Sequence, residues 1–459
     1  MPPYRWLWLT LLSLSLLADP AVAQPRREPP ILFGGGRPKV KPIVTIDPSL
    51  PTGASLGVGA ERPRSALPPT CSFRTPVCVH GAAGIAPPTL LGALGALERA
   101  YERLVWALRL PAPEADLGKG GSDALDLYLL GDKSPLDVKT EGLRLGAFDR
   151  ASAFCTTGEL DGALLERAAT QCVGEAIARR LDAGESPHLQ RAFATALFWL
   201  IGQPTALDVQ AIDDVQSHPE LAIARGKRSR SSDGAALFFQ YLEEARSESD
   251  TGILSTSLLA AAASKTPASA ASYANEPDFF DVLRHTHDEN PAKMAALMAN
   301  FAVARAFVGD REDGLHLPGL GFAGSFGRAR FDWVIPFSSL PRRVLTGRAI
   351  EPSGTELIWI TLDEVPLGIA LGFQAEWEKP VSFQWQLLTL NADGEELQRI
   401  DVPHQERATS AEARVVKLDG AKAVLVVGTN LESVDLAHPF DPDVEPFEPH
   451  SCTIYLAKM

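Results

Sequence analysis

The chain has 459 residues, of which 45% are hydrophobic and 22% are charged, and its formal net charge is -14 at pH 7. Its length allows two or three domains at about 150 residues each, and its apolar content is ample for their cores. The acidic balance disfavours a nucleic-acid-binding protein, because such proteins neutralise phosphates with Lys and Arg.

The N-terminus has the order of a cleavable secretory signal. Arg5 precedes an apolar run over residues 6–17, and Ala21-Val22-Ala23 places small residues at the positions that signal peptidase reads. The run is shorter than the roughly 20 residues of a membrane-spanning helix, so a membrane anchor is the weaker alternative. We expect residues 1–23 to be removed and the mature chain, without a membrane span, to be secreted or periplasmic.

Residues 24–70 are predicted to form an extended linker. They are rich in Pro and Gly, include Gly34-Gly35-Gly36, and have no sustained hydrophobic periodicity. Such composition is typical of segments that cannot bury enough apolar surface to fold.

Residues 71–340 are predicted to form a mostly helical domain. Apolar residues recur at three- and four-residue steps over 89–110, which predicts a helix that ends at Pro111. Alternation predicts strands at 125–129 and 151–155. Further helices are predicted at 162–181, 188–201, 233–246 and 294–307, the third of them capped by Ser232 or Asp233.

In residues 341–459 the hydrophobic periodicity becomes that of β-strands. Short runs rich in Val, Ile, Trp and Phe are separated by turn residues, and Asn391-Ala392-Asp393-Gly394 is a hairpin signal. About seven strands in this stretch predict an antiparallel β-sandwich, and they are expected at 357–362, 369–377, 381–390, 396–402, 412–418, 423–428 and 453–456. The fold class is therefore an α+β multidomain protein, mostly helical first and a sandwich last.

The chain has five cysteines, so at least one is unpaired within the chain. An exported protein can keep disulfides, and closeness in sequence favours Cys71–Cys78 and Cys155–Cys172. As an alternative, Cys71, Cys78 and His80 could hold a metal, but a structural zinc site needs a fourth ligand that the sequence does not show.

Familiar catalytic motifs are absent from the sequence. It has no G-x-S-x-G, no P-loop and no H-E-x-x-H. Histidines concentrate only in His285-Thr286-His287, followed by Asp288 and Glu289. Residues two apart on a helix do not face one another, so a solvated helix end is the favoured interpretation.

Several stretches nevertheless resemble secreted bacterial zinc metallopeptidases of the gluzincin type, in which a β-sandwich commonly follows the peptidase part. They are residues 97–101, 110–111, the strand at 125–129 after a Gly-rich turn, and Gly234-Ala235-Ala236-Leu237-Phe238-Phe239-Gln240-Tyr241-Leu242. The resemblance covers roughly residues 89–459. It implies a strand, then a helix with H-E-x-x-H, then a helix with a glutamate ligand.

The resemblance also implies that the zinc site has been lost. The two histidine positions fall on Cys172 and Ala176, the catalytic glutamate on Val173, and the third ligand on Arg191. A catalytic zinc needs three protein ligands and a group that activates its water, and these side chains cannot supply them. The acidic residues nearby are Glu175 and Glu185, and no cofactor is expected.

Two further clusters have competing interpretations. Asp441, Asp443 and Glu445 are spaced like the first ligands of a calcium loop, but the central Gly and distal Glu of an EF-hand are missing, and a proline-rich surface loop is the plain alternative. The basic run 225–230 predicts an exposed loop, with a polyanion site as the minor alternative.

The favoured function is an exported, catalytically inactive metallopeptidase-like protein that binds a protein or peptide outside the cytoplasm or associates with the envelope. One alternative is an active secreted hydrolase with an unrecognised site, using Glu175 or Glu185 with a distant histidine. Another is a purely structural envelope protein.

Overall fold

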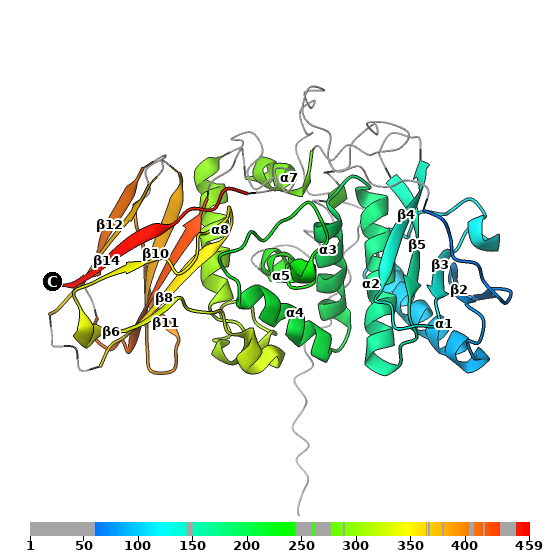
Figure 1. Cartoon of the computed structure of the whole chain (residues 1–459), viewed down its shortest axis with the longest axis horizontal. Coiled ribbons are helices and arrows are strands. Elements are labelled where there is room, and N and C mark those ends of the chain that lie inside the picture. The colour runs from blue at the N-terminus through cyan, green and yellow to red at the C-terminus, as the bar shows by residue number, and fades with distance from the viewer. Residues whose placement is uncertain are drawn as a thin grey trace, which may run out of the picture.

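The computed structural model describes residues 60–144, 150–244, 259–260, 262, 277–287, 290–363, 365, 368–378, 381–403, 408–415, 418–431 and 447–459. The signal segment, most of the expected linker, and the acidic residues Asp441, Asp443 and Glu445 lie outside these residues. Among the described residues, no helix is long and apolar enough to cross a membrane. The described chain has an α+β fold (Figure 1).

The first part of the chain forms a five-stranded sheet in the order β1-β2-β3-β5-β4. Strands β2, β3 and β5 run parallel, whereas β1 and β4 are antiparallel to their neighbours at the two edges. The strands are β1 (Thr70–Cys71), β2 (Val77–Gly81), β3 (Leu125–Leu129), β4 (Asp137–Arg144) and β5 (Arg150–Thr157).

Helices α1 (Pro87–Tyr101) and α2 (Gly162–Leu181) pack on one face of this sheet. Alternation along β2 and β3 turns Val79 and Leu127 into the core that these helices share. The expected helix 89–110 ends at Tyr101 and continues only as a π-helical stretch, Glu102–Ala107. The predicted strand 125–129 and helix 162–181 are confirmed to the residue.

The remaining helices lie between this sheet and the C-terminal strands (Figure 1). They are α3 (Pro187–Ile201), α4 (Ala206–Gln216), α5 (Ala236–Glu244), α7 (Phe279–Thr286) and α8 (Pro291–Arg305). Short 3-10 helices are formed by Lys119–Gly121, Arg230–Ser232, Gly309–Arg311, Gly321–Gly327 and Phe337–Ser339. Helix α3 approaches α2 closely, because a Cβ at Gly174 would lie 3.0 Å from the Cα of Ala194.

Two sheets form the C-terminal part. One has the order β11-β10-β13-β8-β6 and the other β12-β9-β14-β7. Neighbours are antiparallel except for β6 and β8, which are parallel. The strands are β6 (Trp333–Pro336), β7 (Arg342–Leu345), β8 (Thr355–Thr361), β9 (Leu371–Trp377), β10 (Phe383–Leu390), β11 (Glu396–Asp401), β12 (Ser410–Val415), β13 (Ala423–Asn430) and β14 (Cys452–Lys458).

The two sheets share an apolar core that includes Phe373, Trp385 and Ile454. Every strand that the sequence predicts here is present within a few residues. Strand β6 pairs with β8 but begins at Trp333, so the strand region starts ahead of the expected residue 341.

The helical part contacts the strands through a second core and through the loop after α4. Ala302 and Phe307 pack against Leu425 and its neighbours. Loop residues bond the turn before β8, where Thr355 N donates to Pro219 O at 2.7 Å and Glu351 N donates to Glu220 O at 2.9 Å. These contacts join the two parts continuously.

The disulfides join Cys71 to Cys78 and Cys155 to Cys172, which are the pairings favoured from the sequence. The first closes the β1–β2 turn, and the second ties β5 to α2. The fifth cysteine, Cys452, is buried in β14 without a disulfide partner.

Candidate functional site

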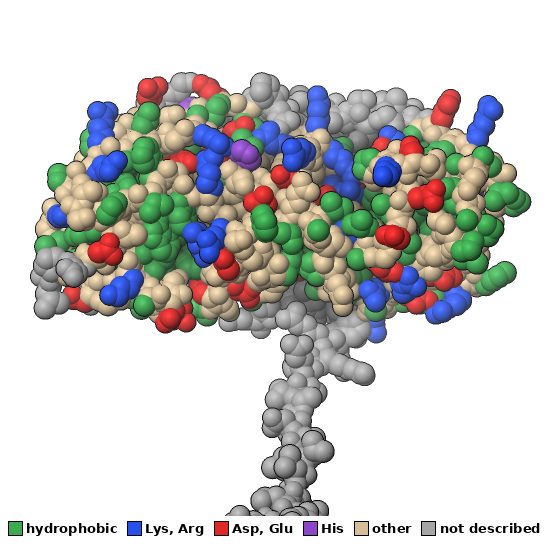
Figure 2. All heavy atoms as spheres, turned by 60° about the horizontal axis from the view of Figure 1, so that its bottom comes forward, with side chains coloured by type: hydrophobic (Ala, Val, Ile, Leu, Met, Phe, Trp, Pro, Cys, Tyr) green, Lys and Arg blue, Asp and Glu red, His purple; other side chains and the backbone are tan. Residues whose placement is uncertain are grey.

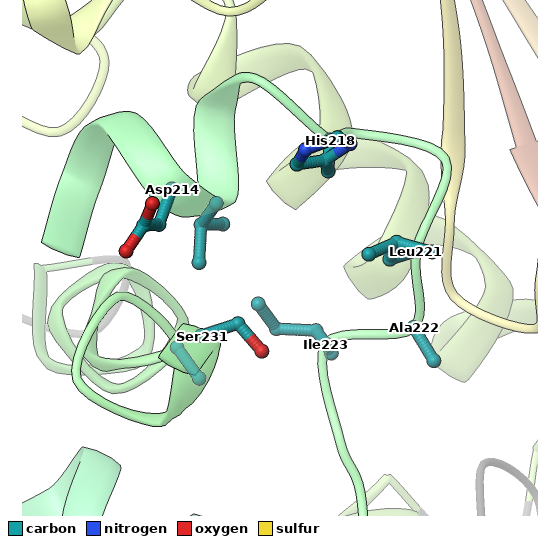
Figure 3. Close-up of a pocket in the computed structure, with 8 residues that line it drawn as sticks. Asp214, His218, Leu221, Ala222, Ile223 and Ser231 are labelled. Atoms are coloured by element: carbon teal, nitrogen blue, oxygen red, sulfur yellow. The ribbon is translucent and has the colours of Figure 1, made fainter. Parts of the chain in front are cut away.

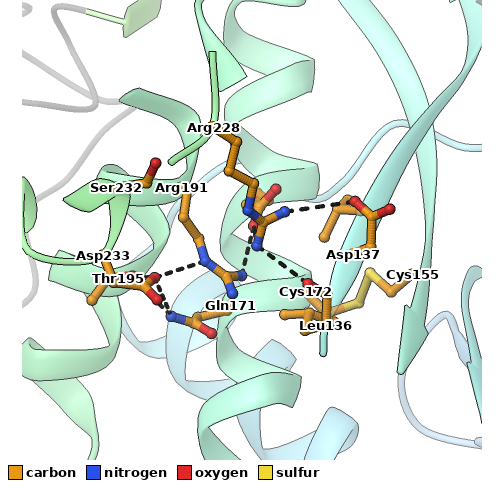
Figure 4. Close-up of polar contacts among 12 residues, drawn as sticks. Leu136, Asp137, Cys155, Gln171, Cys172, Arg191, Thr195, Arg228, Ser232 and Asp233 are labelled. Atoms are coloured by element: carbon orange, nitrogen blue, oxygen red, sulfur yellow. Dashed lines mark hydrogen bonds and ion pairs between the residues drawn. A yellow bond between two sulfur atoms is a disulfide. The ribbon is translucent and has the colours of Figure 1, made fainter. Parts of the chain in front are cut away.

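A buried ion-pair network lies between α2 and α3, where the resemblance places the zinc. Arg191 of α3 donates from Nη1 to Oε1 of Glu175 at 2.8 Å, and its Nε lies 2.7 Å from Oδ1 of Asp233 (Figure 4). Glu175 and Arg191 are 1% and 6% exposed. One guanidinium therefore bridges a carboxylate of α2 and a carboxylate just before α5.

Further side chains complete the network. Arg179 and Arg228 approach the Glu175 carboxylate at 3.1 Å and 3.5 Å. On the other side, Thr195 Oγ1 donates to Oδ1 of Asp233 at 2.7 Å, and Gln171 Nε2 donates to Thr195 Oγ1 at 2.8 Å. Arg167 links Asp233 to Asp208, at 3.2 Å and 2.8 Å. Asp233, one of the two residues predicted as a cap of α5, is thus an ion-pair partner in this network.

The electrostatics keep both carboxylates ionised. Burial acts to raise the pKa of Glu175, but Arg228, Arg191 and Arg179 outweigh it and hold that pKa below its usual value. Burial is likewise outweighed at Asp233, where Arg191 and Arg167 lower the pKa of the carboxyl. A general acid or base works best with a pKa near the operating pH, so neither group is suited to proton transfer.

The structure places the polar face of α2 one residue away from the expected positions. Gln171 and Glu175 are one turn apart and both contact the α3 side of the network. Cys172 instead bonds Cys155 on the sheet, while Val173 and Ala176 lie in the apolar core. Successive side chains on a helix are rotated by about 100° about its axis. A shift of one residue in the assignment therefore replaces side chains that face the sheet with side chains that face α3.

Glu185 lies outside this network. It is fully buried, its Oε1 accepts from Ser186 N at 2.7 Å, and its Oε2 accepts from Phe279 N at 3.0 Å at the start of α7. Its role in the fold is therefore to satisfy backbone donors at two helix starts. Glu175 and Glu185 do not share a site.

Two arginine side chains also donate hydrogen bonds to backbone carbonyl oxygens at the edge of the sheet beside the network. Arg179 Nη2 donates to Val138 O at 3.0 Å, and Arg228 Nη2 donates to Leu136 O at 3.2 Å. An added peptide strand binds through unpaired backbone groups of an edge strand. The Val138 carbonyl of β4 and the Leu136 carbonyl just before this strand are therefore already bonded.

Three arginines of the basic run 225–230, which was weighed as a polyanion site in a minor alternative, have carboxylate partners. Arg225 pairs with Glu351 at 2.5 Å, Arg228 points inward to Glu175, and Arg230 lies 3.3 Å from Asp214. Figure 2 shows one face of the molecule, on which basic, acidic and apolar side chains are interspersed.

Among the described residues, no group of three or more His, Cys, Asp and Glu side chains is arranged to hold a metal. Cys71 and Cys78 are joined to each other, and His80 Nε2 lies 2.8 Å from Oδ1 of Asp126. His285 lies in the last turn of α7 and His287 caps its C-terminus, as expected for a helix end.

A small surface hollow lies beside the loop after α4 (Figure 3). Asp214, His218 and Ser231 are its polar side chains, and the rest of its lining is apolar and includes Leu221 and Ile223. Asp214 pairs with Arg230 at 3.3 Å, and His218 Nδ1 lies 3.2 Å from Glu220. Two of the three polar side chains of the hollow therefore have a neighbouring group of the opposite type.

His188 is buried next to this region and is kept neutral. Its Nδ1 lies 2.9 Å from Ser232 Oγ, and its Nε2 lies 3.0 Å from Ile223 O. Burial lowers the pKa of His188 to about 4. The pair is too enclosed to act as a serine–histidine nucleophile, because Ser232 is 1% exposed.

The lowered pKa of His188 predicts a loss of stability in mild acid. Because the unfolded chain binds a proton near pH 6.5 and the folded chain only near pH 4, the contribution of His188 is complete above pH 6.5 and falls as the pH drops toward 4. Between pH 7 and 4, the free energy of unfolding measured by thermal denaturation should fall by more for the wild type than for His188→Gln, and the difference should exceed about 1 kcal/mol. Parallel curves would contradict this prediction.

No family model matches the chain, and no curated protein matches it. Solved structures with local similarity include the pre-peptidase C-terminal domain of a collagenase from Bacillus anthracis, at 10% identity and a TM-score of 0.19, over 28% of this chain and 97% of that one. An enzymatically active domain of bacteriophage CBA120 tailspike protein 4 matches at 8% identity and a TM-score of 0.17, over 26% and 18%.

A third structure is the periplasmic inhibitor of g-type lysozyme from Aeromonas hydrophila, at 12% identity and a TM-score of 0.16, over 28% of this chain and 99% of that one. TM-scores this low carry no functional argument.

Proposed function

We propose that this protein is an exported, catalytically inactive metallopeptidase-like protein that serves as a protein- or peptide-binding module. The observation that carries the proposal is the Arg191 guanidinium, paired with Glu175 and Asp233 in the buried space between α2 and α3. The sheet, α2 and α3 follow one another in the order that the resemblance implies.

A guanidinium can balance two carboxylates but cannot replace the chemistry of zinc. Catalytic zinc keeps an open position for water and lowers the pKa of that water. An arginine side chain has only donors and stays protonated, so it can neither activate water as a base nor coordinate it. The cation at this position is thus suited to holding α2 and α3 together.

Export is supported by the signal-like N-terminus and by the two disulfides. Disulfides persist mainly in oxidising compartments. The alternative of an active hydrolase is disfavoured by the contacts of Glu175 and Glu185, since both carboxylates are buried and already accept hydrogen bonds. A purely structural envelope role would be favoured if the mature protein bound no peptide.

We expect the purified mature protein to contain no stoichiometric zinc and to show no zinc-dependent peptidase activity, because Arg191 and its partners fill the space where the resemblance would put the metal. Elemental analysis after demetallation and reconstitution, together with cleavage assays on unfolded protein substrates, tests this. One zinc per chain, lost together with proteolysis in Glu175→Gln but kept in the matched surface variant Glu166→Gln of the same helix, would favour the hydrolase.

A further inference from the structure

A cluster of buried carboxylates, here called the acidic pocket, lies on the face of the first sheet opposite α1 and α2. Alternation places Leu127 in the helical core and turns Asp126 and Tyr128 of β3 to the other face. Phe154 of β5 and Glu141 of β4 join them there, with Asp116 from the loop before β3. The three carboxylate side chains are at most 4% exposed.

The pocket is filled by the guanidinium of Arg62, which belongs to a segment that precedes the sheet. Arg62 bonds both oxygens of Glu141, from Nε at 2.6 Å and Nη2 at 2.7 Å, and also bonds Asp116 and Asp126. Its Nη1 lies 3.3 Å from the Tyr128 hydroxyl, and its Cζ lies 5.3 Å from the centre of the Phe154 ring. Paired carboxylate oxygens and an aromatic ring are the features that recognise arginine specifically.

The pocket needs a cation. Burial raises the pKa of Asp116 to about 6 even though Arg62 opposes the shift, and Asp126 and Glu141 add to it. Without a guanidinium, the three buried carboxylates would repel one another in a weakly screened environment. Lys119 approaches Glu141 only to 3.8 Å from the surface, so it does not replace Arg62.

The loop beside the pocket leaves room for the guanidinium. Gly120 has a φ of +78°, and a Cβ there would overlap both Asp126 and Arg62. Glycine adopts this conformation without strain and without a side chain in the way. The pocket is therefore shaped around its occupant by backbone as well as by charge.

The segment that carries Arg62 has few other described attachments. In residues 60–69, Ala66 N donates to Gly81 O at 3.0 Å and Ser65 Oγ lies 3.3 Å from the same oxygen. Residues 64–69 are exposed. Among the described contacts of this segment those of Arg62 are the most numerous, and none of residues 60–69 belongs to the apolar core that includes Val79 and Leu127.

We propose that this pocket is a receptor for an arginine side chain, filled in the free protein by its own Arg62 and available to an arginine-bearing peptide of a partner when residues 60–69 are displaced. The inference rests on the proposed function as a binding module and names its ligand. The net charge of -14 favours encounter with such a basic partner. Exchange of one arginine for another keeps the carboxylates paired throughout.

The test uses the full mature chain with Arg62→Ala and the probe Nα-acetyl-arginine amide, followed by titration calorimetry. Arg62→Ala should bind one probe molecule per chain, at least tenfold more tightly than the wild type, whose own arginine competes. Nα-acetyl-lysine amide should bind at least tenfold more weakly than the arginine probe. The matched control Arg64→Ala, an exposed arginine on the same segment, should behave like the wild type.

If Arg62→Ala does not fold alone, the arginine probe should restore its circular-dichroism spectrum and the lysine probe should not. A folded variant without saturable binding, equal binding of both probes, or an unfolded variant that the arginine probe does not rescue would overturn the proposal. None of these outcomes bears on zinc content or peptidase activity, so failure of this inference is distinguishable from failure of the proposed function.

Discussion

Replacing Arg191 with methionine should lower the free energy of unfolding by about 3–5 kcal/mol, because it removes one partner of a buried ion pair and leaves charge without compensation. Glu175 would lose its contact at 2.8 Å and Asp233 its contact at 2.7 Å. Methionine fills most of the volume of the arginine stem, so the loss reports mainly on charge. Urea denaturation at pH 7, with the slope compared between variants, measures it.

A matched control for this experiment is Arg230→Met, since Arg230 pairs with Asp214 at the surface and its side chain is 81% exposed. That change should stay within about 0.5 kcal/mol of the wild type. The double variant Glu175→Gln with Arg191→Met should lose less than the sum of the two single losses, because each single change already breaks their common contact. A loss below about 1 kcal/mol for Arg191→Met would show that the network does not stabilise the fold.

The sequence predicts two elements to the residue. The helix 162–181 and the strand 125–129 have boundaries that match the structure. The sequence does not predict helix α4 or strand β4, in which Asp208 and Glu141 occupy buried positions. Asp208 is buried because it accepts from Thr205 and Arg167, and Glu141 is buried because it accepts from Arg62. A hydrophobic periodicity cannot reveal such positions.

The candidate site could be predicted only in part for a related reason. Arg191 was singled out from the resemblance, but its partner Asp233 lies beyond a helix and a loop, and the face of α2 was displaced by one residue. The polar pair Gln171 and Glu175, at a spacing of four in an alanine-rich helix, is the local signal that identifies the correct face. Arg62 has no such signal, because its carboxylate partners are 54 to 79 residues away.

Removing the Cys155–Cys172 disulfide by changing both residues to alanine should destabilise the protein by about 3 kcal/mol, through the greater freedom of the unfolded chain. The bond closes a sequence separation of 17 and ties β5 to α2, the helix that presents Glu175. Both cysteines are fully buried, so a reductant should act only after local opening. Thermal and urea unfolding of the double variant measure the loss.

The second disulfide supplies the matched control for this prediction. Cys71–Cys78 closes a separation of only 7, so its replacement by two alanines should cost less, about 2 kcal/mol. Because the β1–β2 turn lies outside the α2–α3 network, that variant should keep the response of the wild type to Arg191→Met. In the variant without Cys155–Cys172, Arg191→Met should lower the free energy of unfolding by less than it does in the wild type. The reason is that α2 is then less firmly held against β5, so Glu175 can move toward water. Equal costs in both backgrounds would mean that the disulfide and the ion-pair network stabilise the fold independently.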